Sequence, residues 1–255
     1  MKYCGKTDIG KKREKNEDRF SAVRVADNAV MLIVCDGMGG AAGGEIASAL
    51  ACESFISELC YQLEPKIRGG KLSFLEPETE IPMALDSALA NANYEVWQKA
   101  QNDASLRGMG TTLVGAFVLE EPLSVYTVNM GDSRVYRVQK ASIDRVTKDH
   151  SYVQMLVDNG EITQKEADSH SHKNIITKAI GISVHPEPDI KEAEFTEGDV
   201  ILLCSDGLYS MLTDDEIHGV ASFGCGTLET KLDRLISLAN DAGGDDNVTA
   251  ILAEL

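Results

Sequence analysis

Four short apolar runs of this chain end at an aspartate or begin just after one. Asp36, Asp132 and Asp206 follow such runs, and Asp246 stands just before the last of them. Short apolar runs bounded by turn residues predict β-strands. Carboxylates at strand ends can converge across a sheet edge, although they lie far apart in the sequence. They would then repel one another unless they were protonated or bridged by cations.

The order of the predicted elements indicates the fold class. Strands are predicted within 19–35 and at 111–119, 123–129, 133–138, 190–195, 200–204 and 248–252, and helices from about 45 to Pro65, at about 82–101 and at 228–239. Residues 68–70 are expected to form a loop. Connections between strands are mostly short, which favours antiparallel sheets, and the helices do not alternate with the strands. We expect an α+β fold in which residues 1–255 form a single domain. Two packed, mainly antiparallel β-sheets form a β-sandwich that is flanked by α-helices.

The charge of the chain limits its partners. Its 24 basic and 41 acidic residues give a formal net charge of −17. Nucleic acids and anionic membrane surfaces both require clustered basic residues, so neither is expected as a partner. An acidic enzyme also repels phosphorylated substrates unless cations neutralise its site locally. Divalent cations such as Mg²⁺ and Mn²⁺, which prefer oxygen ligands, would do this at a carboxylate cluster.

The cysteines and the N-terminus suggest a cytoplasmic location. No apolar run approaches the ~20 residues of a membrane-spanning helix, and the first residues contain no apolar signal core. The six cysteines, Cys4, Cys35, Cys52, Cys60, Cys204 and Cys225, include no C-x-x-C pair. Several lie in apolar runs, so buried thiols in a reducing compartment are expected, and a thiolate metal site is not.

A single Asp-Gly pair is more simply explained as a turn, but eight longer strings are not required by turn chemistry. In chain order they are Arg13-Glu14-Lys15-Asn16-Glu17-Asp18, Asp36-Gly37-Met38-Gly39-Gly40, Gly44-Glu45-Ile46-Ala47-Ser48, Gly110-Thr111-Thr112, Gly131-Asp132-Ser133-Arg134, Lys148-Asp149-His150-Ser151, Ser205-Asp206-Gly207 and Asp246-Asn247-Val248-Thr249. In this order they closely resemble the metal-dependent protein phosphatases of the 2C (PPM) family, in particular its bacterial branch. The resemblance extends from Arg13 to Thr249.

The resemblance implies a two-metal site, holding Mn²⁺ or Mg²⁺, at one edge of the sandwich. Asp36 would bridge both metals, and Gly37 would offer its backbone carbonyl, which the lack of a side chain permits. Asp206 and Asp246 would complete the shell of one metal.

The resemblance assigns further roles around this pair. Glu17 and Asp18 would hold metal-bound waters. Asp132 would join Asp206 at a third, weaker metal position found in bacterial members. Arg13 would bind the substrate phosphate.

These roles form a coherent mechanism for hydrolysis of phosphoserine and phosphothreonine in proteins. A water that bridges two cations loses its proton near neutral pH and becomes a nucleophile. A guanidinium binds two phosphate oxygens and stabilises charge in an in-line transition state. No phosphoenzyme intermediate is needed, and the chain has no Cys-x₅-Arg string of the cysteine phosphatases.

Some residues have simpler interpretations. Arg13 follows Lys11 and Lys12 and, taken alone, would belong to a solvated basic patch. Asp245 neighbours Asp246 but is expected to be a turn residue. The glycine-rich stretch 37–44 lacks the Lys-Ser/Thr ending of a nucleotide-binding loop. The five histidines are most simply explained as surface residues.

The polar segment at about 149–181 resembles the mobile flap of bacterial members. Within it, His170 is hypothesised to protonate the leaving group or to contact the substrate. The chain differs from other members at three positions. Met38 stands where animal members often have histidine, although bacterial members often have Met there; Ala41 stands where many members have histidine; and Ser171 follows His170 where proline is usual. These differences concern the general acid and the geometry of the flap.

Two other functions stay open. A catalytically silent phosphoprotein-binding module would have lost metal ligands, whereas Asp36, Asp206 and Asp246 are all present. Another metal-dependent phosphoesterase, acting on small molecules or nucleotides, would keep the same residues, and the sequence does not separate it from a protein phosphatase. By analogy, the expected partners are phosphorylated proteins, among them a serine/threonine kinase and its substrates.

Overall fold

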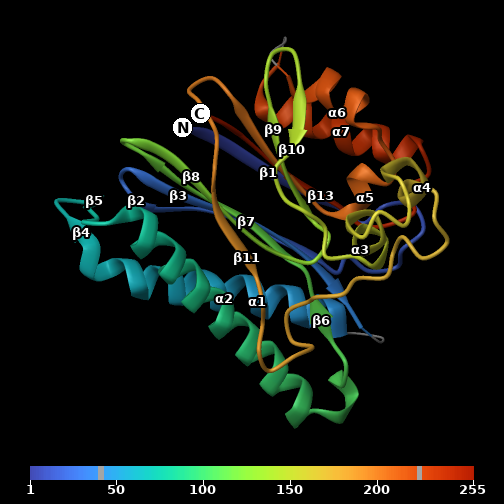
Figure 1. Cartoon of the computed structure of the whole chain (residues 1–255), viewed down its shortest axis with the longest axis horizontal. Helices are drawn as coiled ribbons and strands as arrows, with labels where there is room; N and C mark the ends of the chain where they lie inside the picture. The colour runs from blue at the N-terminus through green and yellow to red at the C-terminus, as the bar shows by residue number, and fades with distance from the viewer. Residues whose placement is uncertain (40–42, 223–225) are drawn as a thin grey trace.

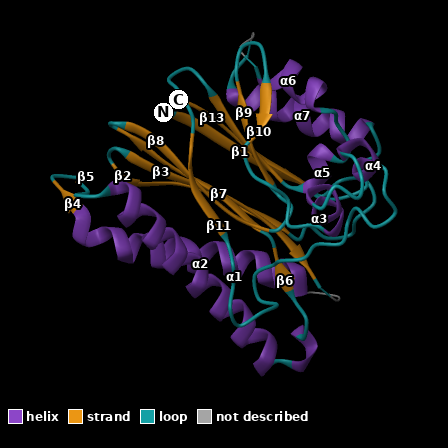
Figure 2. Ribbon diagram, in the orientation of Figure 1, coloured by secondary structure: helices purple, strands orange, loops and turns teal. Residues whose placement is uncertain are grey.

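The computed structural model describes residues 1–39, 43–222 and 226–255, and two β-sheets form its centre (Figures 1 and 2). The first sheet contains, in spatial order, β1 (Lys2–Asp8), β13 (Val248–Glu254), β12 (Val200–Cys204), β9 (Arg134–Val138) and β10 (Ile143–Arg145). The second contains β11 (Asp189–Ala193), β8 (Leu123–Met130), β7 (Leu113–Glu120), β3 (Ala29–Met38) and β2 (Asp18–Ala26), with β6 (Gly110–Thr111) paired to β3. Every strand pair in the described ranges that belongs to these sheets is antiparallel. The predicted α+β sandwich is confirmed.

The alternation of side chains in β3 explains how the layers pack. Val30, Leu32 and Val34 belong to the core between the two sheets, together with residues of β12 and β13. Met31 and Ile33 point the other way and belong to the core beneath the helices. Both faces of this strand are therefore buried, which is why its sequence is apolar without interruption.

Helices cover the outer face of each sheet (Figure 2). Helices α1 (Gly43–Leu63) and α2 (Pro77–Asn102) pack on the second sheet, whereas α6 (Asp214–Ala221) and α7 (Leu228–Asp241) pack on the first. A 3₁₀ turn, Glu64–Lys66, follows α1, and a second one, Ala104–Leu106, follows α2. No helix within the described ranges is long and apolar enough to cross a membrane.

Three predictions about local structure were wrong. Helix α2 begins at Pro77 rather than near 82, because Pro77 suits a first helical turn and burial of Ile81 and Leu85 outweighs the hydrogen bond that Pro82 cannot make. The loop expected at 68–70 was wrong only for Arg68. Gly69 and Gly70, both with positive φ, form the turn of a hairpin between β4 (Ile67–Arg68) and β5 (Lys71–Leu72).

The third concerns Cys60, which is exposed, whereas Cys35, Cys52 and Cys204 are buried as expected. Cys60 stands one residue past the buried face of α1, which Leu59 occupies. Cys225 and Ala41 lie outside the described residues.

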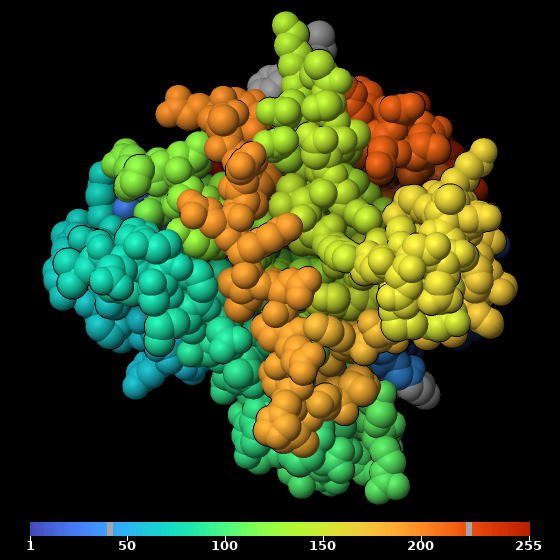
Figure 3. Space-filling view, viewed as in Figure 1, coloured from blue at the N-terminus to red at the C-terminus, as the bar shows by residue number. Residues whose placement is uncertain are grey.

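The segment at about 149–181 contains two short helices, α3 (Tyr152–Asp158) and α4 (Gln164–Asp168). It forms a lobe at one end of the sandwich, coloured yellow in Figures 1 and 3, beside α5 (Asp206–Tyr209). The lobe therefore lies at the same end of the sandwich as the junction between β12 and α5. Its mobility stays a prediction.

The connection between α1 and α2 is fixed to the sheet by one buried side chain, and this generates a prediction. The Asn28 side chain donates to Leu72 O at 3.1 Å and accepts from Leu72 N at 2.8 Å. Asn28→Ala leaves both groups unpaired and should lower the free energy of unfolding by about 1–3 kcal/mol, measured in urea. The exposed Asn102→Ala serves as the control and should change it by less than about 0.5 kcal/mol. Equal effects of the two substitutions would contradict this role.

Candidate metal centre

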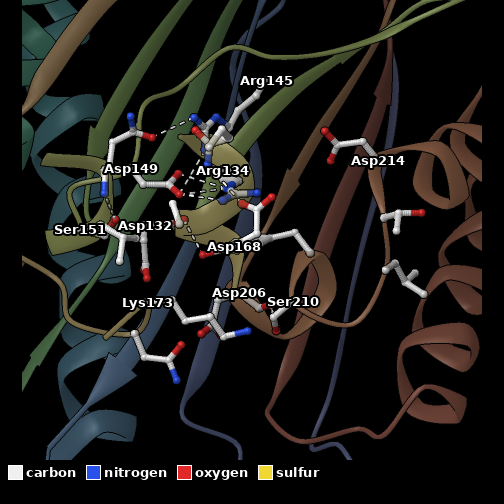
Figure 4. Close-up of a pocket in the computed structure, with 18 of the residues that line it drawn as sticks. Asp132, Arg134, Arg145, Asp149, Ser151, Asp168, Lys173, Asp206, Ser210 and Asp214 are labelled. Atoms are coloured by element: carbon white, nitrogen blue, oxygen red, sulfur yellow. Dashed lines mark hydrogen bonds and ion pairs between the residues drawn. The ribbon is translucent and has the colours of Figure 1, made fainter. Parts of the chain in front are cut away.

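The fold brings together five aspartates that are far apart in the sequence. Asp36 stands near the end of β3, and Asp18, the first residue of β2, pairs directly with it. Asp206 begins α5 directly after β12, Asp132 lies in the turn between β8 and β9, and Asp246 precedes β13. Figure 4 shows Asp132 and Asp206 beside the lobe. The convergence expected from the strand ends is present.

The surroundings of four of these carboxyl groups, those of Asp18, Asp36, Asp132 and Asp206, raise their pKa values above the ordinary value of an aspartate. Burial, followed by the charges of Asp18 and Asp206, raises the pKa of Asp36 well above its ordinary value. Burial is also the main cause that raises the pKa of Asp18 and Asp132 to about 7 and that of Asp206 to about 6. Neighbouring carboxylates add to each shift. Divalent cations would remove this repulsion and keep the groups ionised.

Several features test whether the residues fit such cations. The oxygens Asp18 Oδ1 and Asp206 Oδ1 are buried without a hydrogen-bond partner. A Cβ on Gly37 would lie 2.1 Å from Gly44 O and 2.6 Å from Glu17 O, so only glycine allows this approach of the backbone. The donors are all oxygens, as Mg²⁺ and Mn²⁺ prefer. The residues therefore fit hard divalent ions.

The side chains do not form a complete metal shell by themselves. Within residues 1–39, 43–222 and 226–255, no three His, Cys, Asp or Glu side chains are arranged as a ready metal site. Asp206 Oδ1 has no hydrogen-bond partner, whereas the carboxylate of Asp246 forms an ion pair with Arg13. Backbone carbonyls and waters would have to supply further ligands.

One buried amide attaches the N-terminal loop to this site. Asn247 accepts from Glu17 N at 2.8 Å and donates to Ile9 O and Lys15 O, each at 2.9 Å. The loop that carries Arg13 is therefore held against the segment before β13. Arg13 Nη2 lies 2.7 Å from Asp246 Oδ2, and about half of its side chain is exposed (51%). A guanidinium thus stands at the edge of the carboxylate cluster.

Two acidic residues of the predicted set have other neighbours. Asp18 Oδ2 accepts from Ser205 Oγ at 2.7 Å. Glu17 packs against the first turn of α1, because a Cβ on Gly44 would meet its carboxylate at 2.7–2.8 Å. Asp245, which neighbours Asp246, pairs with Lys12 at 2.6 Å. The role of each acidic residue stays a prediction. The two neighbouring aspartates nevertheless have different partners, because Asp245 pairs with Lys12 and Asp246 with Arg13.

A charged network beside Asp132 was missed by the sequence analysis. Arg134 donates to both carboxylate oxygens of Asp149, at 2.7 and 3.0 Å, and lies 3.6 Å from the ring centre of Tyr209. Tyr209 Oη in turn donates to Asp132 O at 3.0 Å. Arg134 and Asp149 occur in the strings 131–134 and 148–151, but these strings do not show which charged residues pair with each other.

A cavity of about 650 Å³ extends from Asp132 and Asp206 to the lobe (Figure 4). The lobe contributes Asp168 and Lys173 to its lining. His170 belongs to a ring cluster with Tyr152 and His172, at centroid distances of 6.4 and 5.5 Å. The positive charge of Lys173 partly offsets the burial that raises the pKa of Asp206, so Lys173 is a second residue of the lobe, beside His170, that faces the site.

Comparison with known proteins gives the family. The family model described as protein phosphatase 2C matches residues 4–253. The chain belongs to the protein phosphatase 2C family. It is 35% identical over 249 residues to the serine/threonine phosphatase stp of Listeria monocytogenes, covering 98% of this chain and 94% of that protein.

Solved structures of the family agree with the fold. A serine/threonine phosphatase of Staphylococcus aureus is 37% identical, with a TM-score of 0.84 over 99% of this chain and 94% of that one. The catalytic domain of the phosphatase PstP, in complex with two manganese ions, is 34% identical, with a TM-score of 0.77 over 99% and 97% of the two chains. The family resemblance seen in the sequence is confirmed.

The raised carboxyl pKa values of this protein phosphatase 2C family member predict how its stability depends on pH. Between about pH 4 and 7 the folded chain retains protons on Asp18, Asp132 and Asp206 that the unfolded chain has released. The free energy of unfolding should therefore fall as pH rises through this range. In EDTA the Tm should decrease from pH 5 to pH 7.5, by roughly 5 °C.

The control for this experiment is the same measurement in Mn²⁺. Bound ions keep the carboxylates ionised in the folded state, so the decrease should disappear or reverse. Asp18→Asn in EDTA should make the decrease smaller, whereas Asp168→Asn, in the exposed lobe, should not. A Tm that rises with pH in EDTA would refute the argument.

Proposed function

We propose that the chain is a metal-dependent phosphatase that hydrolyses phosphoserine and phosphothreonine in proteins. The proposal rests on the buried cluster of carboxylates around Asp36 and Asp206, which offers only oxygen ligands and has Arg13 at its edge. Its relatives are named serine/threonine phosphatases, which supports the reaction class.

Four residues would hold two Mn²⁺ or Mg²⁺ ions. Asp36 would contact both, Gly37 would offer its carbonyl, and Asp206 and Asp246 would complete one shell. Glu17 and Asp18 would hold water ligands in place. When bound, the ions supply an ionised water as nucleophile and neutralise charge on the phosphate. Asp132 and Asp206 would hold a third ion.

Arg13 would bind the phosphate of the substrate. Its guanidinium presents parallel N–H groups that match two phosphate oxygens, and these bonds strengthen as charge develops in the transition state. Its exposed side chain can leave Asp246 and turn to an incoming phosphate, since an exposed ion pair contributes little stability.

The two thiols that stand next to the carboxylate cluster in the sequence, those of Cys35 and Cys204, offer no alternative nucleophile. Burial raises the pKa values of Cys35 and Cys204, which are inaccessible. Water is therefore the proposed nucleophile, without a phosphoenzyme.

We also propose the substrates, their location and a role for His170. The substrates would be cytoplasmic phosphoproteins, among them a serine/threonine kinase and its targets. His170 would contact the substrate or protonate the leaving group from the lobe.

The first experiment compares neighbouring aspartates. Wild-type chain should release phosphate from a phosphothreonine peptide only with Mn²⁺ or Mg²⁺. Asp246→Asn and Asp206→Asn should lower kcat/KM by at least about 100-fold, because each removes an anionic ligand. Asp245→Asn is the matched control, since its carboxylate pairs with Lys12, and it should stay within about 2-fold of wild type.

The outcomes separate the competing functions. Equal losses in Asp245→Asn and Asp246→Asn would argue against the assignment of the ligand. Faster hydrolysis of nucleotides than of phosphopeptides would favour a small-molecule phosphoesterase. Absence of phosphate release by folded protein with either metal would favour the silent binding module.

The role of Arg13 gives a separate prediction. Arg13→Ala should reduce kcat/KM for the phosphopeptide by about 10- to 100-fold, the effect of losing charged hydrogen bonds to phosphate. Binding of Mn²⁺ should persist. Lys12→Ala removes the adjacent positive charge and should have little effect, measured at the same ionic strength. Similar losses in both variants would instead indicate general attraction by a basic patch.

A further inference from the structure

His150, which lies outside the aspartate cluster, holds the turn that carries Asp132. Its backbone N–H donates to Gly131 O at 2.8 Å, and its ring atom Nδ1 accepts from Gly131 N at 3.2 Å. Both polar backbone groups of Gly131 are thus bound by one residue. The turn has no spare room, because Gly131 has φ +127° and a Cβ there would lie 2.6 Å from the Thr112 side chain.

The ring of His150 is itself fixed from the other side. It is buried (8% exposed), so the prediction that the five histidines are surface residues was wrong for His150. Its Nε2 lies 3.2 Å from Asp189 Oδ2 at the start of β11. This contact is electrostatic, since Nε2 makes no well-directed hydrogen bond. Because Nδ1 accepts a hydrogen bond, the ring proton belongs on Nε2, facing the carboxylate. Burial lowers the pKa of His150, in keeping with a neutral ring.

The neighbours of His150 act on the same turn. Asp149 binds Arg134, two residues after Asp132, and Tyr209 Oη donates to Asp132 O. Side-chain bonds therefore hold Asp132 on its C-terminal side, while His150 holds the residue before it. The carboxylate of Asp132 and that of Asp206 line the same cavity.

We propose that His150 is a positioning residue. By accepting the Gly131 N–H at Nδ1, it sets the turn so that Asp132 presents its carboxylate to a divalent cation shared with Asp206. The inference rests on the proposed metal site, but it concerns ion binding and not hydrolysis. A purely structural role would lower stability without distinguishing one metal position from another.

The test is Mn²⁺ binding by calorimetric titration, without substrate. Wild type should show two tighter equivalents and a weaker third that Asp132→Asn abolishes. His150→Leu should weaken only the third, by about 10-fold. His150→Asn should restore most of the affinity, because its amide oxygen can take the place of Nδ1. His150→Gln should not, because its polar group reaches the position of Nε2. The exposed His185→Asn is the control.

Several results would overturn the proposal. The proposal is wrong if His150→Leu binds Mn²⁺ as wild type does, or if it weakens the binding of all equivalents equally. It is also wrong if His150→Asn binds the third ion no better than His150→Gln does, or if wild type and Asp132→Asn bind the same number of ions. If His150→Leu does not fold, the comparison of the folded Asn and Gln variants decides. Mn²⁺ binding as expected, without phosphopeptide hydrolysis, would support the role of His150 and contradict the proposed function.

Discussion

Mutual repulsion of buried carboxylates is the constraint on which the rest of this structure depends. Beyond burial, the charges of neighbouring carboxylates, including that of Asp246, raise the pKa values of Asp18, Asp36, Asp132 and Asp206. A flexible loop would relieve such repulsion by moving the groups apart. Here each group is attached at or near the end of a strand or at the start of a helix, and these elements belong to a sandwich whose core is closely packed. The rigidity of the sheets is what keeps like charges together until cations bind.

Neutral polar side chains set the positions of the charged ones. Thr112 Oγ1 accepts from Asp36 N at 3.0 Å and bonds Ser133 Oγ at 2.8 Å, so it connects the β3 and β9 ends. Ser205 Oγ bonds Asp18 and accepts from Thr249 N at 3.0 Å, which connects the two sheets at the same edge. These hydroxyls add no charge to a crowded site. Ser205 orients the carboxylate of Asp18 directly, and Thr112 fixes the backbone that carries Asp36, as second-layer ligands do in metal sites.

The sequence predicted the sheets and the carboxylate positions well because buried strands have apolar runs and the aspartates lie at their ends. It did not predict β1, since Lys2–Asp8 is an edge strand of mostly half-buried polar residues that pairs only with β13. The Arg134, Asp149 and Tyr209 network was also missed. Its members are 15 to 75 residues apart along the chain, and their pairing depends on where the lobe packs. Contacts set by tertiary packing leave no local pattern to read.

Segments near the two ends of the chain must also meet for Arg13, the proposed phosphate-binding residue, to reach the cluster. Lys11, Lys12 and Arg13 pair in order with Asp241, Asp245 and Asp246. Each pair is largely exposed and contributes little, so this series cannot by itself hold the loop. The buried amide of Asn247 makes the closer connection, through three hydrogen bonds to the segment 9–17. Asn247 thus fixes the loop while the ion pairs stay exchangeable, and in the proposed mechanism this would allow Arg13 to exchange Asp246 for a phosphate.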